Sequence, residues 1–275
     1  MSKIAVLITC HNRKNKTLKC LERLFLQNVD TDVFLVDDGS SDGTAEAVEK
    51  EYPKVNIIKG NGTLYWNRGM YTAWEHAEKG DYDFYLWLND DTYIFDGALQ
   101  MTLDCSASCN DSAIIIGASC DPVDHSVTTF GADVKGRSLY PNGTLQHCDE
   151  FGGNFVLVPR SVYHICGKID PYYHHSLGDT DYGKMAAKKG INVYLAPQHA
   201  AECINDFEIP KLPWLDSSRS LRERYKMLFH PLSYSNPKEF FYFYKKHQNI
   251  FVALIHVCSI YRNLLNIKAI NKYKK

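Results

Sequence analysis

The sequence contains no run of about 18 apolar residues, the length that a membrane-spanning helix needs. Its first apolar run covers only residues 4–8 and leads straight into a polar turn, so it is too short for a secretory signal. Both observations exclude a membrane-spanning protein, and they predict a cytoplasmic one.

An excess of charge of one sign is also missing, because the formal net charge is only -1 at pH 7. This balance gives no signature of nucleic-acid binding. Charged residues make up 23% and apolar residues 45% of the 275 positions, which is ordinary for a globular protein. The length fits one large α/β domain or two small ones.

The nine cysteines include no Cys-x-x-Cys pair, and their number is odd. This pattern fits a reducing compartment better than a disulfide framework. Cys105 and Cys109 are the nearest pair in sequence, and helix packing explains their spacing more simply than a metal site does.

Short apolar runs alternate with amphipathic stretches along the first 88 residues. The runs predict strands at 4–8, 33–36, 55–59 and 84–88, and the stretches between them predict helices at 17–28, 44–52 and 70–79. Strands that alternate with helices form a parallel sheet with right-handed crossovers. We therefore expect an α/β fold with a mostly parallel sheet and flanking helices.

The pattern becomes more varied after the fourth strand. We expect a helix at 97–108, a strand at 113–118, a hairpin insertion within 119–150, a strand at 155–158, helices at 161–166 and 184–189, and a strand at 191–196. The segments 217–229 and 237–272 are predicted to be helical.

Polar side chains follow the predicted strands at their carboxyl ends, where open α/β sheets bind ligands. Asp90 and Asp91 end the fourth strand, and two adjacent carboxylates of this kind suit Mg²⁺ or Mn²⁺. A solvated acidic turn is the alternative reading. Asp38 is suited to accept the imide N–H of a uridine- or thymidine-type base, and His11 to stack on that base, although His11 can equally be a surface histidine.

Three motifs in order resemble family 2 glycosyltransferases with the Rossmann-like GT-A fold. They are Val36-Asp37-Asp38-Gly39-Ser40-Ser41-Asp42-Gly43-Thr44, Asn89-Asp90-Asp91 and Gly178-Asp179-Thr180-Asp181. The resemblance extends over residues 4–197 and is closest to enzymes of bacterial surface-polysaccharide synthesis. It divides the chain into a nucleotide-sugar-binding half (1–118), an acceptor-side half (119–213) and a helical basic extension (214–275).

For the donor, the resemblance implies base contacts from Thr9, His11 and Asp38, a ribose or pyrophosphate contact from Asp90, and a Mn²⁺ or Mg²⁺ ion on Asp91. It further implies that a loop over residues 60–69 covers the donor. Within this loop Asn67 and Arg68 would contact the donor, with Arg68 meeting a phosphate charge, and Trp66 would lie on the sugar side.

For the transfer step, Asp179 matches the base that deprotonates the acceptor hydroxyl, and the reaction inverts the anomeric carbon. The alternative role for Asp179 is a helix N-cap. Gly153, Asn154 and Asp181 would border the sugar or the acceptor. The third metal ligand is not identified, because relatives carry a histidine where residues 202–203 are Glu-Cys, and His199 comes earlier.

These features predict an inverting, metal-dependent transfer from a UDP- or dTDP-sugar to a hydroxyl of a glycan or lipid-linked acceptor. A sugar-phosphate nucleotidyltransferase and a non-catalytic nucleotide-sugar-binding module are the alternatives. The first alternative needs a glycine-rich turn after strand one, which the sequence lacks. No nucleic acid is expected as a partner.

The segment 238–275 is strongly basic, with eight Lys or Arg residues and Glu239 as its one acid. This extension predicts attachment to the inner face of a membrane. Packing on the domain or against a second subunit, as in a homodimer, is the alternative.

Overall fold

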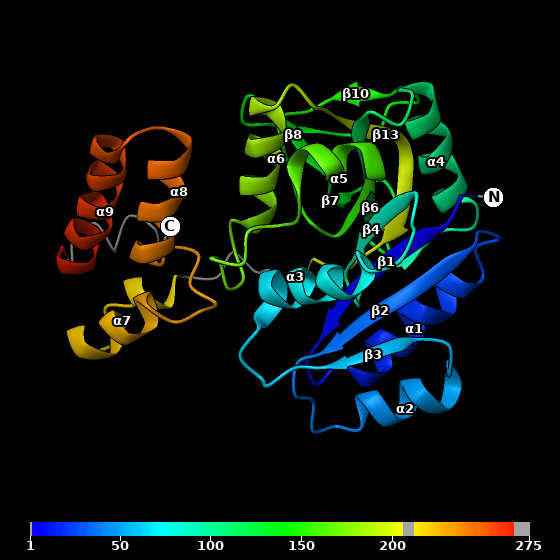
Figure 1. Cartoon of the computed structure of the whole chain (residues 1–275). Helices are drawn as coiled ribbons and strands as arrows, with labels where there is room; N and C mark the ends of the chain where they lie inside the picture. The colour runs from blue at the N-terminus through cyan, green and yellow to red at the C-terminus, as the bar shows by residue number, and fades with distance from the viewer. Residues whose placement is uncertain (1, 206–211, 267–275) are drawn as a thin grey trace.

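The computed structural model describes residues 2–205 and 212–266 (Figure 1). A ten-stranded sheet with the strand order β10-β13-β6-β12-β4-β1-β2-β3 forms its centre. One half of the sheet is parallel and consists of β4 (Phe84–Leu88), β1 (Ile4–Cys10), β2 (Thr31–Asp37) and β3 (Asn56–Lys59). The four predicted strands of the first 88 residues are confirmed.

The other half of the sheet is mixed. Here β12 (Phe155–Pro159) runs antiparallel between β4 and β6 (Ala113–Cys120), and β13 (Asn192–Glu202) runs parallel to β6. The short strands β5 (Tyr93–Ile94), β7 (Thr128–Phe130) and β10 (Gln146–His147) add to this half. Part of the expected hairpin insertion forms a separate sheet of β8 (Ala132–Val134), β9 (Arg137–Leu139) and β11 (Glu150–Phe151), while β7 and β10 join the main sheet.

Helices cover both faces of the sheet. One face is covered by α1 (Lys14–Phe25), α2 (Thr44–Glu51) and α4 (Ala98–Ser108). On this face Ile4, Val6 and Ile8 of β1 pack in the core. The face with α3 (Tyr65–Ala77), α5 (Arg160–Cys166) and α6 (Gly178–Lys188) takes Ala5 and Leu7. Burial on both faces explains why β1 is apolar throughout rather than alternating.

Helix α1 begins and ends three residues before its predicted range of 17–28, and the start of α3 differs more. Helix α3 begins at Tyr65 rather than at residue 70, so Trp66, Asn67 and Arg68 belong to its first turn and not to a loop. The carboxylate of Asp38 accepts the backbone N–H of Leu64 at 2.9 Å and that of Tyr65 at 3.0 Å. Asp38, which follows β2, therefore accepts the free N–H groups at the start of α3. The local sequence around residue 65 does not reveal this contact.

The C-terminal extension contains a short 3₁₀ turn η1 (Pro213–Leu215) and the helices α7 (Leu221–Leu228), α8 (Pro237–His247) and α9 (Ile250–Leu265). It has a small core of its own, which includes Trp214, Leu228, Ile260 and Leu264. The predicted helical segment 237–272 is confirmed as two helices up to Leu265, and Asn249 starts the second by accepting the N–H of Val252. Residues 267–272 lie outside the described residues.

Two further expectations concern the whole chain. All nine cysteines lie in the described residues and are free thiols, as expected. Within residues 2–205 and 212–266, every helix is too short or too polar to cross a lipid bilayer.

Candidate functional site

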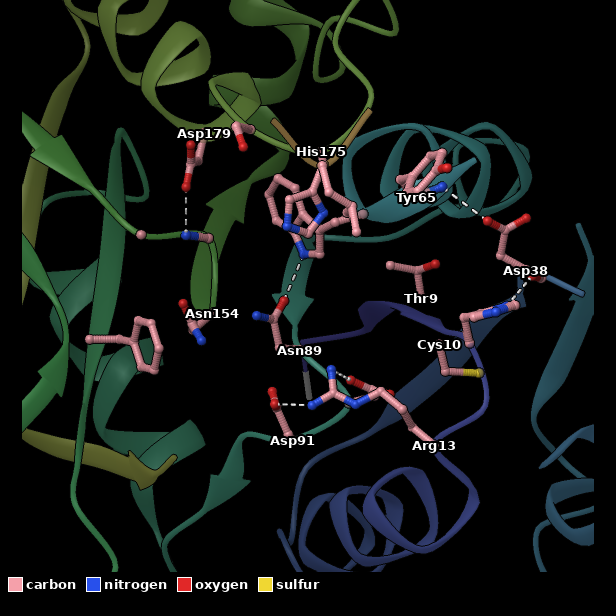
Figure 2. Close-up of a pocket in the computed structure, with 18 of the residues that line it drawn as sticks. Thr9, Cys10, Arg13, Asp38, Tyr65, Asn89, Asp91, Asn154, His175 and Asp179 are labelled. Carbon is pink, nitrogen blue, oxygen red and sulfur yellow. Dashed lines mark hydrogen bonds and ion pairs between the residues drawn. The ribbon is translucent and has the colours of Figure 1, made fainter. Parts of the chain in front are cut away.

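A cavity of about 920 Å³ opens where β1, β2 and β4 end (Figure 2). Its volume is in the range of ligand pockets. Three acids from distant parts of the chain line it: Asp38 after β2, Asp91 after β4 and Asp179 in α6. Figure 2 shows these three side chains on different sides of one hollow. The predicted residues that line the cavity are Thr9, His11, Asp38, Trp66, Asp90, Asp91, Gly153, Asn154 and Asp179.

The end of the cavity next to β1 and β2 is organised by Asp38. Besides the two N–H groups at the start of α3, its carboxylate accepts the N–H of Gly62 at 2.8 Å. Nδ1 of His11 donates to the backbone carbonyl of Asp38 at 2.7 Å. Asp38 is buried, and its carboxylate holds the segment 62–65 at the edge of the cavity. His11 is exposed, so its imidazole is accessible from the cavity.

The two carboxylates after β4 share a cation that the sequence analysis did not identify. The guanidinium of Arg13 lies 3.1 Å from Oδ1 of Asp90 and forms a second, shorter ion pair with Oδ2 of Asp91. Lys16 adds a positive charge 3.8 Å from Asp91. The repulsion expected between adjacent acids is therefore offset by side chains from α1 and the turn before it.

Asp90 is the more buried of the two acids, with 3% of its surface exposed. Burial raises the pKa of Asp90 to about 7, and the Asp91 charge also raises it, while Arg13 and the Thr17 hydroxyl act in the opposite direction. Asp91 keeps 18% of its side chain exposed. Asp91 is therefore the acid that a ligand in the cavity reaches first.

The fit of a divalent ion depends on Asp91. Its Oδ1 has the Cys203 thiol 3.9 Å away, and burial raises the pKa of that thiol to about 12. Across the described part of the chain, no three His, Cys, Asp or Glu side chains are grouped to hold a metal. One carboxylate together with substrate phosphates is nevertheless a usual environment for Mg²⁺, so the residues fit an ion that arrives with a diphosphate.

Asp179 faces the cavity from the first turn of α6. Its Oδ2 accepts the N–H of Gly153 at 3.1 Å and its Oδ1 accepts the N–H of Thr180 at 2.8 Å. The N-cap position is Leu177, in the left-handed region, so Asp179 does not cap the helix. Burial raises the pKa of Asp179 above its usual value, and the two backbone bonds only partly oppose this. Such a carboxylate is suited to take up a proton.

Trp66 and Gly153 meet beside Asp179. The indole N–H of Trp66 donates to Oδ1 of Asn89 at 2.7 Å, which orients the ring. A Cβ atom at residue 153 would overlap the Trp66 ring, so this position requires glycine. Asn154 lies next to it, and its carbonyl accepts the N–H of Asn89 at 3.0 Å. Through its hydrogen bonds to Asn89 and Asp179, the segment 152–154 connects the turn after β4 to α6.

Three predicted site residues do not line the cavity. Asn67 is completely buried, and its amide donates to the carbonyls of Asp170 and Tyr173. Arg68 points outward and donates to the carbonyls of Pro171 and Tyr172. Because α3 starts early, both side chains face the 170–173 segment instead of the cavity, so this structure does not bring them to the proposed donor site.

Asp181 is the third residue outside the cavity. Its side chain is 1% exposed, and it pairs with Lys246 at 2.7 Å and with His247 at 2.7 Å. The Tyr173 hydroxyl donates to it at 2.9 Å. The prediction that Asp181 borders the acceptor is corrected: it holds α8 of the extension against α6.

The three histidines near the cavity have different surroundings. His175 lines the cavity, and burial lowers its pKa. His174 turns away and places Nδ1 2.6 Å from Oε1 of Glu239. His199, which the sequence offered as a weak metal ligand, lies 2.8 Å from the Thr128 hydroxyl and does not line the cavity.

The extension contributes a wall of the cavity that the sequence analysis did not predict. His230, Leu232 and Tyr234, from the connection between α7 and α8, line it together with Asp179. Burial and the charge of Asp179 raise the pKa of Tyr234. No local motif marks these residues, because they reach the site only through the docking of the extension.

Comparison with known proteins gives a family match for the N-terminal half. Residues 5–125 match the model described as Glycosyl transferase family 2. This range contains Asp38, Asp90 and Asp91 but ends before Asp179. No curated protein matches the chain.

Solved structures are similar over most of the chain. Mannosyltransferase PcManGT from Pyrobaculum calidifontis, in complex with GDP-Man and Mn²⁺, has a TM-score of 0.59 and 14% identity, with 94% of this chain and 73% of that one covered. TarS 1–349 from S. aureus has a TM-score of 0.55 and 13% identity, covering 99% and 92%. The same protein in complex with UDP has a TM-score of 0.52 and 14% identity, covering 86% and 69%. At these identities the likeness shows the fold, which is GT-A.

Proposed function

We propose that this chain, whose residues 5–125 match the glycosyl transferase family 2 model and whose fold is GT-A, is a glycosyltransferase that transfers a sugar with inversion from a nucleoside diphosphate donor to a hydroxyl acceptor. The observation that carries the proposal is the common cavity of Asp38, Asp91 and Asp179. In this cavity Asp38 would bind the nucleobase of the donor, Asp91 would bind the cation on its diphosphate, and Asp179 would accept the proton of the acceptor.

The donor lies with its base near Thr9, His11 and Asp38 and its diphosphate near Arg13 and Asp91. His11 is exposed at the cavity, so its ring can stack on a uracil or thymine base, and the donor that we propose is a UDP- or dTDP-sugar. Arg13 reaches both acids and keeps 37% of its side chain exposed to the cavity side, so a diphosphate can share its guanidinium. The UDP in one TarS structure and the GDP-Man in PcManGT are consistent with a diphosphate in this place.

A divalent ion, Mn²⁺ or Mg²⁺, is held by Asp91 together with the donor diphosphate. When bound, it supplies positive charge that stabilises the departing diphosphate. Mn²⁺ in the PcManGT complex supports this choice.

Asp179 acts as the base of the transfer. It accepts the proton of the acceptor hydroxyl while the hydroxyl oxygen forms a bond to the anomeric carbon. The bond from that carbon to the diphosphate oxygen breaks at the opposite side, so the configuration inverts and the nucleoside diphosphate leaves. The hydrogen bonds from Gly153 and Thr180 hold the carboxylate in place for this step.

The acceptor enters beside Asp179, between Trp66 and the wall made by His230, Leu232 and Tyr234. Aromatic and apolar side chains of this kind suit the ring of a sugar. Together with the family resemblance and the basic extension, this wall supports a glycan or a lipid-linked sugar as the acceptor, in cell-surface polysaccharide synthesis.

Thermal unfolding with a panel of nucleotide sugars, in the presence and absence of Mn²⁺, tests the donor. The correct donor raises the unfolding temperature in proportion to its occupancy, and its effect depends on the ion. The Asp91→Asn variant serves as a comparison, because it loses the carboxylate proposed to hold the ion, so its response to the donor should not depend on Mn²⁺. If no nucleoside diphosphate sugar stabilises the wild-type protein, the proposal fails.

A further inference from the structure

One face of α9 carries exposed apolar side chains along its whole length. Phe251 is 74% exposed, Ile255 67% and Leu265 66%, and Leu254 is 47% exposed. Together with the exposed Cys258, these five residues form what we call the outer stripe. Their spacing places them on one side of the helix, which is about 24 Å long at 1.5 Å per residue.

The opposite side of α9 is already used. Ala253, Ile260 and Leu264 are buried, and the last two pack in the small core with Trp214 and Leu228. Within the described residues, the outer stripe is therefore a second apolar face of α9, opposite the face that packs in the small core. Figure 1 shows α9 as the outermost helix, on the side of α8 away from the sheet.

The charged side chains that α8 and α9 expose are all basic. Lys238 and Lys245 of α8 and Arg262 of α9 are exposed. Arg262 lies on the same side of α9 as the stripe, between Cys258 and Leu265. The sequence continues after α9 with four lysines and no acid in residues 267–275.

The one acid in α8 and α9 is turned inward. Glu239 is 3% exposed and pairs with His174 of the main domain. Lys246 also points inward, to Asp170 and Asp181, each at 2.7 Å. These contacts fix the orientation of α8 and α9. The described surface of these two helices therefore presents the apolar outer stripe, and its exposed charges are all positive.

We propose that the outer stripe docks on an anionic lipid surface. Phe251, Ile255 and their neighbours enter the interface between headgroups and acyl chains, while Lys245 and Arg262 remain at the level of the anionic headgroups. A helix with an apolar face and basic flanks binds lipid surfaces through both effects.

A second copy of the chain fits the same surface less well. A symmetric pair of outer stripes would cover Arg262 of each copy, and the described surface of α8 and α9 has no exposed acid to pair with it. The charge pattern therefore favours lipid over self-association.

Co-sedimentation of the full chain with vesicles tests the proposal and needs neither donor nor acceptor. The vesicles contain phosphatidylcholine with about one third phosphatidylglycerol, and pure phosphatidylcholine vesicles are the comparison. We expect binding to the anionic vesicles that weakens as salt is added. The double variant Phe251→Glu and Ile255→Glu should lower the vesicle affinity by about tenfold or more.

The matched control adds the same two charges elsewhere. Val123 and Val127 are 94% and 49% exposed in the connection before β7, and their replacement by glutamate should leave vesicle binding unchanged. A second variant, Lys245→Glu with Arg262→Glu, removes the basic flank at exposed positions and should abolish the preference for anionic lipid. Thermal unfolding shows that each variant is folded.

Two results would overturn the proposal. One is wild-type protein that does not bind anionic vesicles. The other is a stripe variant that binds them as well as the wild type, and a loss of dimers in sedimentation velocity with that variant would assign the stripe to a second copy. Because binding is measured without sugar transfer, either failure leaves the proposed enzymatic function untouched.

Discussion

Arg13, in the turn after β1, forms an ion pair with Asp91, which lies 78 residues further along the chain at the end of β4. The same guanidinium contacts Asp90 at 3.1 Å. This contact explains how two adjacent acids are tolerated at the edge of the sheet, and it places a permanent cation beside the proposed diphosphate site.

Replacement of Arg13 by glutamine should lower the free energy of unfolding by about 1–2 kcal/mol, because the buried Asp90 loses its charged partner. Urea unfolding measures the change, and donor affinity in the thermal assay should fall as well. Arg222→Gln is the control, since Arg222 is exposed on α7. Equal stability of the Arg13 variant and the wild type would contradict the assignment.

Asp91→Asn should remove the effect of Mn²⁺ on donor binding, because an amide is a poorer ligand for a hard cation than a carboxylate. Isothermal titration with UDP, with and without Mn²⁺, measures this effect. Asp96→Asn changes an exposed acid five residues away in the same connection and should behave like the wild type. A Mn²⁺ dependence that survives in Asp91→Asn would rule out this metal ligand.

Asp179→Asn should retain donor binding and lower turnover by about 10²–10⁴-fold, the usual contribution of a general base. Burial raises the pKa of Asp179, and only the ionised carboxylate accepts the proton. The wild-type rate should therefore fall as the pH drops through that raised pKa, while the residual rate of the variant lacks this acid limb. Asp104→Asn, at an exposed position on α4, is the control. Full turnover of the variant would exclude Asp179 as the base.

Gly153→Ala should displace the Trp66 ring, because the added methyl group would overlap it. The cost of such overpacking is about 1–3 kcal/mol, and we expect part of it to appear as weaker binding of the donor sugar. Gly152→Ala is a close control, since its nearest neighbour would be Oδ1 of Asn154 at 3.4 Å. The comparison of Michaelis constants for the two variants tests the prediction, and equal values would refute it.

Lys246→Met should lower the free energy of unfolding by about 3 kcal/mol, because it leaves the buried carboxylate of Asp181 without its lysine. The effect should include easier proteolysis of the extension. Lys245→Met removes the same charge from the neighbouring exposed position and should change stability little. If both variants unfold alike, the inward ion pair does not hold the extension.

The sequence predicted the fold well where its signals are local. The strands 4–8 and 84–88 are apolar because both faces of the sheet are covered, and their pattern is visible without any structure. The start of α3 was missed because its cap comes from Asp38, on another strand. The break between α8 and α9 was missed because Asn249 interrupts an otherwise continuous helical pattern.

The sequence could predict those residues of the candidate site that come directly after a strand. Asp38, Asp90 and Asp91 are placed by β2 and β4, whose positions the sequence indicates. Arg13 and Tyr234 depend on contacts across the fold, and their own surroundings in the sequence carry no signal. Arg68 was misplaced because a shift of a helix start turns a side chain to another face of the helix.

The ion pair of Asp181 with Lys246 limits how this enzyme can be divided. Asp181 lies in the same helical turn as Asp179, so the segment that carries the proposed base is anchored by the last part of the chain. A truncation at the end of the family match, or an exchange of the extension with that of a relative, would remove a support of the active helix along with the extension. Chimeric transferases built on this scaffold therefore need the extension and α6 taken from the same parent.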